Sequence, residues 1–388
     1  MLVTMFINFL SHHQLPFCLE MTKELGDNFV YVALEPLYQE QKNLGYDDMD
    51  KKYPFVLRAY ENEENFAKAK ELLTVSDVAI FGSCPNWMIN YRLKTNKLSI
   101  IYTERYFKKG TWRRFIPITY YKIYDRVLKH KNKNLFIICS SAYVPYDLKL
   151  LGYNKPTYAW GYFTEVKQFE INNLLERKSD NPVKILCACR FLNWKHVDDA
   201  ILTAKKLKDN GHRFSMDIIG GGEKESQLKY LVDKLNLQDI VKFLGSMPSN
   251  DVRLHMEEAN IFLVNSDFNE GWGAVMNEAM SSGCAVVASH AAGSVPLLIK
   301  DGSNGFIYKS GDLNDLYKKT ESLVIDKELR LRFSTEVYKT MSSFWNAEYA
   351  TRRFITIIKE KFNSEEITEY TDGPCSQLKI IKNNWYKS

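Results

Sequence analysis

The stretch of residues 269–283 reads NEGWGAVMNEAMSSG. A short apolar run, residues 261–264, precedes it, and a second one, residues 285–288, follows it. Short apolar runs bounded by turn residues are typical of buried parallel strands, and residues 274–282 between them suit a helix. The stretch therefore predicts a strand, a glycine-containing loop, a helix and a second parallel strand.

Strands and helices alternate over the rest of the second half. The expected strands are residues 183–189, 215–219 and 240–244. The expected helices are residues 197–207, 223–235 and 249–258, the last with Ser249 or Asn250 as its N-cap. Short connections between these elements require right-handed crossovers, so the strands form a parallel sheet with helices on both faces.

The first half shows a similar alternation, with expected strands at residues 3–9, 29–32, 78–81, 98–102 and 135–139. A chain of 388 residues is also too long for one ordinary core. We expect an α/β fold of two Rossmann-like, doubly wound domains that face a cleft. The expected parts are an N-terminal domain (1–165), a polar linker (166–181), a C-terminal domain (182–345), a helix crossing back to the N-terminal domain (346–363) and a tail (364–388).

The composition, with 45% apolar and 26% charged residues, is that of a soluble globular protein. The seven cysteines are odd in number and show no zinc-ligand spacing, so we expect buried free thiols in a reducing compartment. The apolar N-terminus is short and lacks a basic flank and a cleavage site, and no apolar run is long enough to span a bilayer. We therefore expect a cytoplasmic protein.

The loop inside the quoted stretch has the features of a diphosphate site. In open parallel sheets, ligands bind at the carboxyl ends of the strands, where helix N-termini point. Gly271 and Gly273 allow the backbone to approach a ligand closely, and the helix from Ala274 offers unpaired N–H groups and a favourable dipole. Glu270 precedes this loop and Glu278 lies inside the helix, so we expect their carboxylates to contact different parts of one extended ligand.

The spacing of these residues matches the pattern of a known family. Glu270 to Gly283 follows Glu-Gly-aromatic-Gly-x4-Glu-Ala-x3-Gly, and Arg190 and Lys195 form an Arg-x4-Lys pair after the first expected strand of the second half. Residues 218–223, 241–245 and 301–306 supply three further blocks. The chain thereby resembles glycosyltransferase family 4, the retaining enzymes of the GT-B fold. The resemblance is dense over residues 183–324 and weak over the first half.

The resemblance implies a role for each matching residue. Arg190 and Lys195 would stabilise the charge that develops on the departing diphosphate, so no metal ion or other cofactor is expected. Glu270 would lie beside the donor sugar and completes the expected catalytic set. Glu278 would hold the ribose hydroxyls. The rest of the expected donor-binding set lies around the diphosphate and the nucleobase: Gly271, Trp272, Gly273, Ala274, Gly221, Gly222, Phe243 and Leu244.

Simpler interpretations of these residues also exist. Arg190 and Lys195 alone would be solvated surface charges, but their position between a strand and a helix favours a ligand. Residues 220–222 form a run of three glycines and not a G-x-G-x-x-G fingerprint, and no suitably placed acid follows the next strand. A dinucleotide site is therefore disfavoured.

The acceptor side is less defined, because the family pattern fails in the first half. After the first expected strand, where many relatives have a glycine-rich loop, this chain has His12 and His13. Adjacent histidines seldom share one ion, so a metal site is disfavoured, and we expect a place facing the cleft or a structural role. Glu104, after the expected strand 98–102, is either an acceptor-side base or a salt-bridge partner of Arg105.

Residues 105–133 are strongly basic, with ten Lys or Arg and one acid, Asp125, and aromatic residues lie between them. Cationic side chains interleaved with aromatic rings suit an anionic membrane surface, where the rings lie among the headgroups. The alternative is an ordinary solvated basic face. No recognised binding module surrounds the run, so nucleic acid is not expected as a partner.

Together these features predict a retaining glycosyltransferase, attached peripherally to the inner face of the membrane. It would move a hexose or N-acetylhexosamine from a UDP- or GDP-sugar to a glycan acceptor, such as a lipid-linked capsule, exopolysaccharide or lipopolysaccharide intermediate. The alternatives are a sugar-nucleotide epimerase of the same fold and a glycosyltransferase-like binding module without catalysis. The retained Arg190, Lys195 and two glutamates disfavour the binding module.

Overall fold

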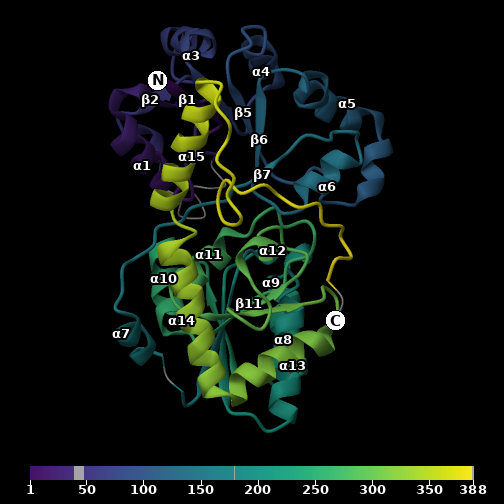
Figure 1. Cartoon of the computed structure of the whole chain (residues 1–388). Helices are drawn as coiled ribbons and strands as arrows, with labels where there is room; N and C mark the ends of the chain where they lie inside the picture. Colours follow the sequence, from purple (N-terminus) through teal and green to yellow (C-terminus); the bar gives the residue numbers. More distant parts are fainter. Residues whose placement is uncertain (39–47, 179, 387–388) are drawn as a thin grey trace. The chain divides into compact units, whose positions relative to one another are not determined.

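The computed structural model describes residues 1–38, 48–178 and 180–386. The chain divides into two compact units (Figure 1). The first unit consists of Met1–Thr164 and Trp345–Lys382, and the second consists of Glu165–Phe344 and the residues from Asn383 onward. The chain therefore builds most of the first unit, then the second, returns to the first and ends in the second.

The second unit is built on a parallel sheet of six strands, in the order β10-β9-β8-β11-β12-β13. Its strands are β8 (Val183–Ala188), β9 (Phe214–Ile219), β10 (Val241–Gly245), β11 (Ile261–Val264), β12 (Ala285–Ser289) and β13 (Phe306–Tyr308). Its helices are α7 (Ile171–Glu176), α8 (Val197–Asp209), α9 (Glu225–Lys234), α10 (Ser249–Glu258), α11 (Ala274–Ser281), α12 (Val295–Leu298), α13 (Leu313–Ile325) and α14 (Lys327–Ser343).

The first unit has a seven-stranded parallel sheet of order β3-β2-β1-β4-β5-β6-β7. Its strands are β1 (Val3–Ile7), β2 (Phe29–Ala33), β3 (Val56–Arg58), β4 (Val78–Phe81), β5 (Ser99–Thr103), β6 (Leu135–Cys139) and β7 (Tyr158–Ala159). Its helices are α1 (Leu15–Leu25), α3 (Glu63–Val75), α4 (Asn86–Arg92), α5 (Pro117–Arg126), α6 (Val144–Lys149) and α15 (Ala347–Phe362), with the short helix η3 (Thr111–Phe115) ahead of α5. Both units are thus Rossmann-like, as the sequence predicts.

The elements that the sequence predicts agree with the structure within a few residues, apart from three local errors. Helix α10 begins at Ser249 as expected, but its N-cap is Pro248 and no side chain caps it, so the prediction of Ser249 or Asn250 is wrong. Strands β3, β7 and β13 were not predicted, because two or three residues are too short to show a periodic pattern. Helix α7 forms inside the stretch expected to be a linker.

The core of the second unit shows why its strands and helices adopt these places. Val183, Ile185 and Cys187 alternate along β8 and face the same apolar core as one face of helix α8. That face has a 3.6-residue period, which buries one side of α8 against the sheet. Its buried apolar residues are Val197, Ala200, Ile201, Ala204 and Leu207, the set that the sequence places together.

The segment after α15 is held against β7 in the first unit. The Ala159 N–H donates to the Ser376 carbonyl over 2.8 Å, and the Leu378 N–H donates to the Thr157 carbonyl over 2.8 Å. Helix α15 packs on the same unit, with the Phe354 ring edge-on to the Phe17 ring at 5.8 Å. The last residues, from Asn383, then join the second unit.

All seven cysteines are free thiols, as the sequence predicts, and Cys84 and Cys189 are only half-buried. Within the ranges that the structure describes, no helix combines the length and the apolar character needed to cross a bilayer.

Replacing Ile201 by alanine tests the assignment of α8 to the core. The Ile201 side chain is fully buried, so Ile201→Ala removes packed methyl groups and should lower the free energy of unfolding of the second unit by about 2–5 kcal/mol. Urea unfolding followed by circular dichroism measures this. The control is Asp209→Ala at the exposed end of the same helix, which should cost less than about 1 kcal/mol.

Candidate functional site

The strand order of the second unit reverses between β8 and β11, which are neighbours in the sheet although two strands separate them in the sequence. Ile185 pairs with Ile261 and Leu186 with Phe262, both in parallel register. The loops after these two strands therefore leave the same edge of the sheet, which is where ligands bind in open parallel sheets. We call them the β8 loop (residues 189–196) and the donor loop (residues 265–273).

Lys195 of the β8 loop and Glu270 of the donor loop form an ion pair. Lys195 Nζ lies very close to Glu270 Oε2, and Ser266 Oγ donates to the same carboxylate oxygen over 3.0 Å. Only 11% of each of the two ionised side chains is exposed. Two of the three residues expected to be catalytic are therefore in direct contact, although 75 positions separate them in the chain.

Three further contacts join the two loops. The Asp267 N–H donates to the Trp194 carbonyl over 3.0 Å, and the Asn265 side-chain amide donates to the His196 carbonyl over 3.2 Å. The third contact joins His196 Nε2 and Asp267 Oδ2, 3.4 Å apart. Arg190, the third residue expected to be catalytic, has an exposed side chain in the same β8 loop. The loops after β8 and β11, which carry Lys195 and Arg190 on one side and the carboxylates of Asp267 and Glu270 on the other, are thus fixed to each other.

The N-terminus of α11 lies directly after Glu270. Gly273 is its N-cap, in the left-handed region (φ 90°), and no side chain caps the helix. A Cβ atom at Gly273 would meet Glu270 Cγ only at an ordinary contact distance of 3.4 Å, so it is the left-handed backbone conformation that favours glycine here. Uncapped N–H groups at a helix start attract anions. Residues 271–274, where the sequence predicts the diphosphate, therefore lie beside the Lys195–Glu270 pair.

The Trp272 and Glu278 side chains of this segment lie in different surroundings. The Trp272 indole is buried and donates to Asn277 Oδ1 over 2.9 Å, so this ring supports the start of α11 from within. Trp272 therefore contributes its backbone, and not its ring, to the surface of the donor loop. Glu278 lies one turn further along α11, with Arg253 of α10 as a nearby cation.

The glycines and aromatic residues expected around the nucleobase lie at the same edge, after β9 and β10. The Phe191 N–H donates to the Gly221 carbonyl over 2.8 Å, and the Phe191 and Phe243 rings meet edge to face at 5.9 Å. A Cβ atom at Gly220 would lie 1.9 Å from the Cys189 carbonyl oxygen, which only glycine avoids. Gly222 follows β9 and Leu244 lies at the end of β10, so both are at this same edge of the sheet.

In the first unit, the structure connects two of the candidate acceptor-side residues. The His13 and Tyr162 rings lie 5.6 Å apart, and the Tyr162 hydroxyl donates to Glu104 Oε1 over 2.8 Å. The His12 ring lies 3.8 Å from the His13 ring. Sequence analysis missed Tyr162, which follows the short strand β7. Its position between apolar aromatic residues, in the run YAWGYF, was the available signal.

The ion pair that the sequence offered between Glu104 and Arg105 is replaced by two others. Glu104 pairs with Lys108, whereas Arg105 pairs with Asp147 at 3.2 Å with both side chains fully buried. Arg126 also points inward and donates to the Cys84 carbonyl over 3.1 Å. The interpretation of residues 105–133 as one continuous basic surface is therefore wrong at these two arginines, because their side chains satisfy buried polar groups.

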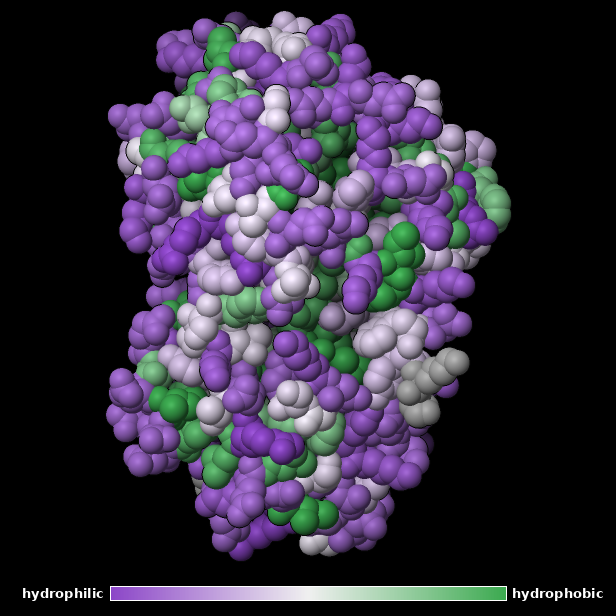
Figure 2. Space-filling view, viewed as in Figure 1, coloured by the Kyte–Doolittle hydropathy of each residue, from purple (hydrophilic) through white to green (hydrophobic). Residues whose placement is uncertain are grey.

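An exposed part of this stretch lies on η3, on α5 and just ahead of them. Its apolar members are unusually exposed, with 73% of Phe115, 64% of Ile118 and 64% of Tyr121 accessible. Figure 2 shows apolar side chains beside hydrophilic ones where α5 reaches the surface. We call this surface the α5 patch. It consists of Trp112, Phe115, Ile118, Tyr121 and the basic residues Lys109, Arg113 and Lys122.

Residues 170–340 match the model of the family described as "Glycosyl transferases group 1". Among curated proteins, the chain is similar to the amylovoran biosynthesis glycosyltransferase AmsK of Erwinia amylovora, at 34% identity over 140 residues. These are 35% of this chain and 34% of AmsK. It is also similar to the putative colanic acid biosynthesis glycosyltransferase WcaL of Escherichia coli K12, at 29% identity over 143 residues, 36% of this chain and 35% of WcaL. The similarity spans about a third of the length of these two relatives.

A solved structure covers more of the chain. Anabaena Alr3699/HepE in complex with UDP superposes with a TM-score of 0.69, at 14% identity, over 93% of this chain and 100% of that one. The fold predicted from the sequence is thereby confirmed: both units have the Rossmann-like sheets of GT-B glycosyltransferases.

The His196–Asp267 contact between the two loops should make stability depend on pH. The hydrogen bond to Asp267 raises the pKa of His196 above its ordinary value of about 6.5, against the effect of partial burial. Asp199 and Asp198 nearby act in the same direction. A raised pKa means that protonated His196 stabilises the fold below the ordinary value, and this stabilisation is lost as the pH rises through the raised pKa.

We therefore expect Asp267→Asn to destabilise the second unit more near pH 6 than near pH 8.5, and urea unfolding at about these two values measures the difference. An equal loss at both values would show that His196 carries no charge in this contact. The matched control is Asp312→Asn, which removes an N-cap carboxylate of the same unit that contacts backbone N–H groups.

Proposed function

We propose a function for this chain that starts from the match of residues 170–340 to the glycosyl transferases group 1 model. The chain transfers a sugar from a nucleoside-diphosphate sugar to a glycan and retains the configuration at the anomeric carbon. The UDP complex of the similar HepE structure supports a UDP-sugar as the donor. The names of AmsK and WcaL support a growing polysaccharide as the acceptor.

The contact between Lys195 and Glu270 is the observation that carries this proposal. When the bond to the anomeric carbon breaks, negative charge grows on the departing diphosphate, and a cation held at that point stabilises the transition state more than the ground state. Lys195 pairs with Glu270 just ahead of α11, and the uncapped N–H groups at the start of that helix also attract anions. Arg190, on the same loop, supplies the second cation, so the transfer needs no metal ion.

Glu270 has a different part in this scheme. Its carboxylate is held by Lys195 and Ser266 at the end of the donor loop, so it lies beside the sugar end of the donor and binds its hydroxyls. A carboxylate already paired with a lysine is a weak nucleophile, which argues against a covalent intermediate at Glu270. Glu278, one turn further along α11, binds the ribose hydroxyls.

The acceptor binds at the first unit in this proposal. Glu104, Tyr162 and His13 form a connected polar group at the carboxyl ends of β5, β7 and β1. Carboxylate and hydroxyl groups of this kind hydrogen-bond sugar hydroxyls, and Glu104 is placed to take the proton of the attacking hydroxyl. The chain would act in the cytoplasm on a lipid-linked intermediate.

Exchange of Glu270 tests the proposed activity. Glu270→Gln keeps the size of the side chain but removes its charge, so transfer should fall by about 10²–10³-fold while UDP binding stays within about threefold. The measurements are nucleotide release from a panel of UDP- and GDP-sugars with lipid-linked glycan acceptors, and calorimetric titration with UDP. Lys195→Ala should lower transfer by a similar factor and also weaken UDP binding.

The control is Glu328→Gln, an exposed carboxylate at the start of α14, which should change neither quantity. Unchanged transfer in Glu270→Gln would contradict the proposed role. A new sugar nucleotide formed from the donor alone would instead identify an epimerase. Binding of UDP without any transfer or conversion would identify a binding module.

We also propose that the α5 patch attaches the chain to an anionic membrane surface. Its aromatic and aliphatic side chains are exposed beside Lys109, Arg113 and Lys122, and such residues together prefer the headgroup region. Each cation near an anionic leaflet contributes about 1 kcal/mol, and the apolar side chains add burial in the interface. The combination suits reversible attachment at the place where a lipid-linked acceptor is found.

Vesicle cosedimentation tests the attachment. The chain should bind vesicles containing phosphatidylglycerol and release them at high salt, whereas pure phosphatidylcholine vesicles should bind it weakly. The double variant Lys109→Glu/Lys122→Glu should weaken binding by about 10²-fold or more, because two attractions become repulsions. The control is Tyr230→Ala, an equally exposed aromatic residue in the second unit. Equal binding by the charge-reversed variant would contradict the attachment.

A further inference from the structure

His290 lies at the carboxyl end of β12, beside the donor loop. Its ring meets the Phe268 ring of that loop edge to face, with the ring centroids 5.4 Å apart. Two neighbours of His290 hold the same loop: the Gly293 N–H donates to the Glu270 carbonyl over 3.3 Å, and Ser294 Oγ donates to the Trp272 carbonyl over 2.5 Å. The position of the donor loop therefore depends on the segment that begins at His290.

The hydrogen bonds of His290 define the state of its imidazole. The Ser310 N–H donates to Nδ1 over 2.9 Å, so Nδ1 carries no proton. Nε2 lies 3.2 Å from the Asn383 carbonyl oxygen and donates to it, which makes the ring neutral. Burial also lowers the pKa of His290, in agreement with this assignment. The ring is thus held by the chain around Ser310 and by the C-terminal segment.

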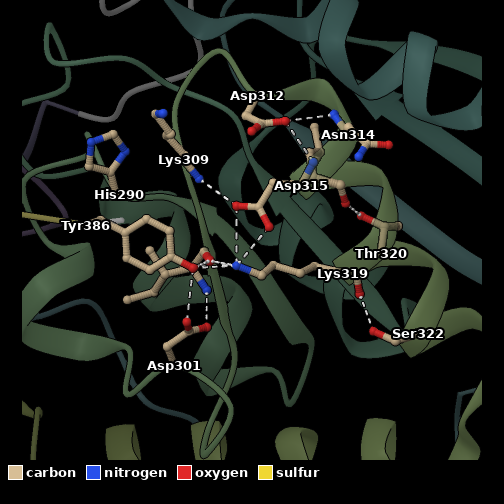
Figure 3. A network of polar contacts seen from close by, with 12 residues as sticks. His290, Asp301, Lys309, Asp312, Asn314, Asp315, Lys319, Thr320, Ser322 and Tyr386 are labelled. Atoms are coloured by element: carbon tan, nitrogen blue, oxygen red, sulfur yellow. Dashed lines mark hydrogen bonds and ion pairs between the residues drawn. The ribbon is translucent and has the colours of Figure 1, made fainter. Parts of the chain in front are cut away.

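The C-terminal segment, residues 383–386, covers the remaining side of this ring. The Tyr386 and Trp385 rings lie 5.9 and 6.4 Å from the His290 ring. The Tyr386 hydroxyl is 3.1 Å from Asp301 Oδ2 and 2.5 Å from the Ile307 carbonyl oxygen, and it accepts a hydrogen bond from Lys319 (Figure 3).

The site that receives Tyr386 is itself ordered by other contacts. Asp301 Oδ1 accepts the Ile307 N–H over 2.8 Å, and Lys319 pairs with Asp315 at 3.1 Å in the same network (Figure 3). Lys319 Nζ also lies 5.0 Å from the centre of the Tyr386 ring. The Tyr386 hydroxyl therefore contacts the Asp301 carboxylate, the Ile307 carbonyl and the Lys319 ammonium group. Asp301 lies in the loop before β13, Ile307 in β13 and Lys319 in α13. Tyr386 is therefore held by several specific contacts, which we call the Tyr386 anchor.

We propose that residues 383–386 hold the donor loop in its binding conformation by fixing His290, which is a positioning residue for the donor. The chain of contacts runs from Tyr386, Trp385 and Asn383 to the His290 ring, and from there to Phe268 and the donor loop. This inference rests on the proposed function, because it assigns a purpose to the order of the loop. Releasing the anchor lowers the fraction of chains with a competent loop, and the apparent donor affinity falls by that fraction.

Deletion of residues 383–388 tests the proposal. UDP binding measured by calorimetry should weaken on the order of 5–20-fold, and the KM for the donor should rise by the same factor. The kcat should stay within about twofold, since a saturating donor selects the competent loop. Tyr386→Ala should reproduce most of the effect, and Tyr386→Phe, which keeps the ring against His290, should give a smaller one. The control is Asn384→Ala, because Asn384 is an exposed residue between Asn383 and Trp385.

A double-variant cycle separates an effect through His290 from a general loss of stability. His290→Ala should weaken UDP binding in the full chain and add little in the deleted chain, because both changes break the same series of contacts. Fully additive effects, or deletion that leaves the UDP affinity within twofold of the full chain, would overturn the proposal. A fall in kcat at unchanged donor KM would overturn it as well.

Hydrogen exchange keeps this test independent of the proposed function. In the nucleotide-free protein, deletion of residues 383–388 should speed amide exchange in residues 266–273 and leave the amides of α8 unchanged. If the full chain binds neither UDP nor GDP, the proposed function fails, and the exchange experiment still decides whether the C-terminal segment orders the loop. Unchanged exchange in residues 266–273 would overturn the inference by itself.

Discussion

Parallel pairing between β8 and β11 is the constraint on which the site of the second unit depends. The register Ile185–Ile261 and Leu186–Phe262 brings the two strands side by side at the place where the strand order reverses. Because the strands are parallel, their following loops must leave the same edge of the sheet. Lys195 and Glu270, far apart in the sequence, meet for this reason and not because of any local preference.

The Lys195–Glu270 pair also shows how the protein stabilises two charged side chains in a mostly buried position before a donor binds. A lone lysine or glutamate that is only 11% exposed would be strongly destabilised, whereas the two together satisfy each other, and Ser266 adds a hydrogen bond. In the function that we propose, an arriving diphosphate takes over part of the attraction to Lys195. The charge needed for the transition state is then present from the start, and little reorganisation is required.

The two units differ in how much their sequences revealed. In the second unit, Gly273, Glu278 and Arg190 lie at positions that local patterns and the family pattern mark, and the structure places all three around one edge of the sheet. In the first unit, Glu104 and His13 were candidates without a connection between them. Tyr162, which follows the two-residue strand β7, supplies that connection, and so short a strand shows no periodicity in the sequence.

From the sequence alone, the type and approximate bounds of strands β1, β2, β4–β6 and β8–β12 and of helices α8–α11 and α15 could be predicted, because apolar period and turn residues are local properties that burial of one face requires. The sequence also indicated the donor loop, because glycine allows the left-handed backbone conformation that the loop adopts at Gly273. Only the tertiary structure decided that Lys195 pairs with Glu270, that Arg105 and Arg126 turn inward, and that Tyr386 anchors beside His290. These are contacts between residues far apart in the chain. Their formation depends on sheet order and on the partners that burial leaves available, which no local pattern contains.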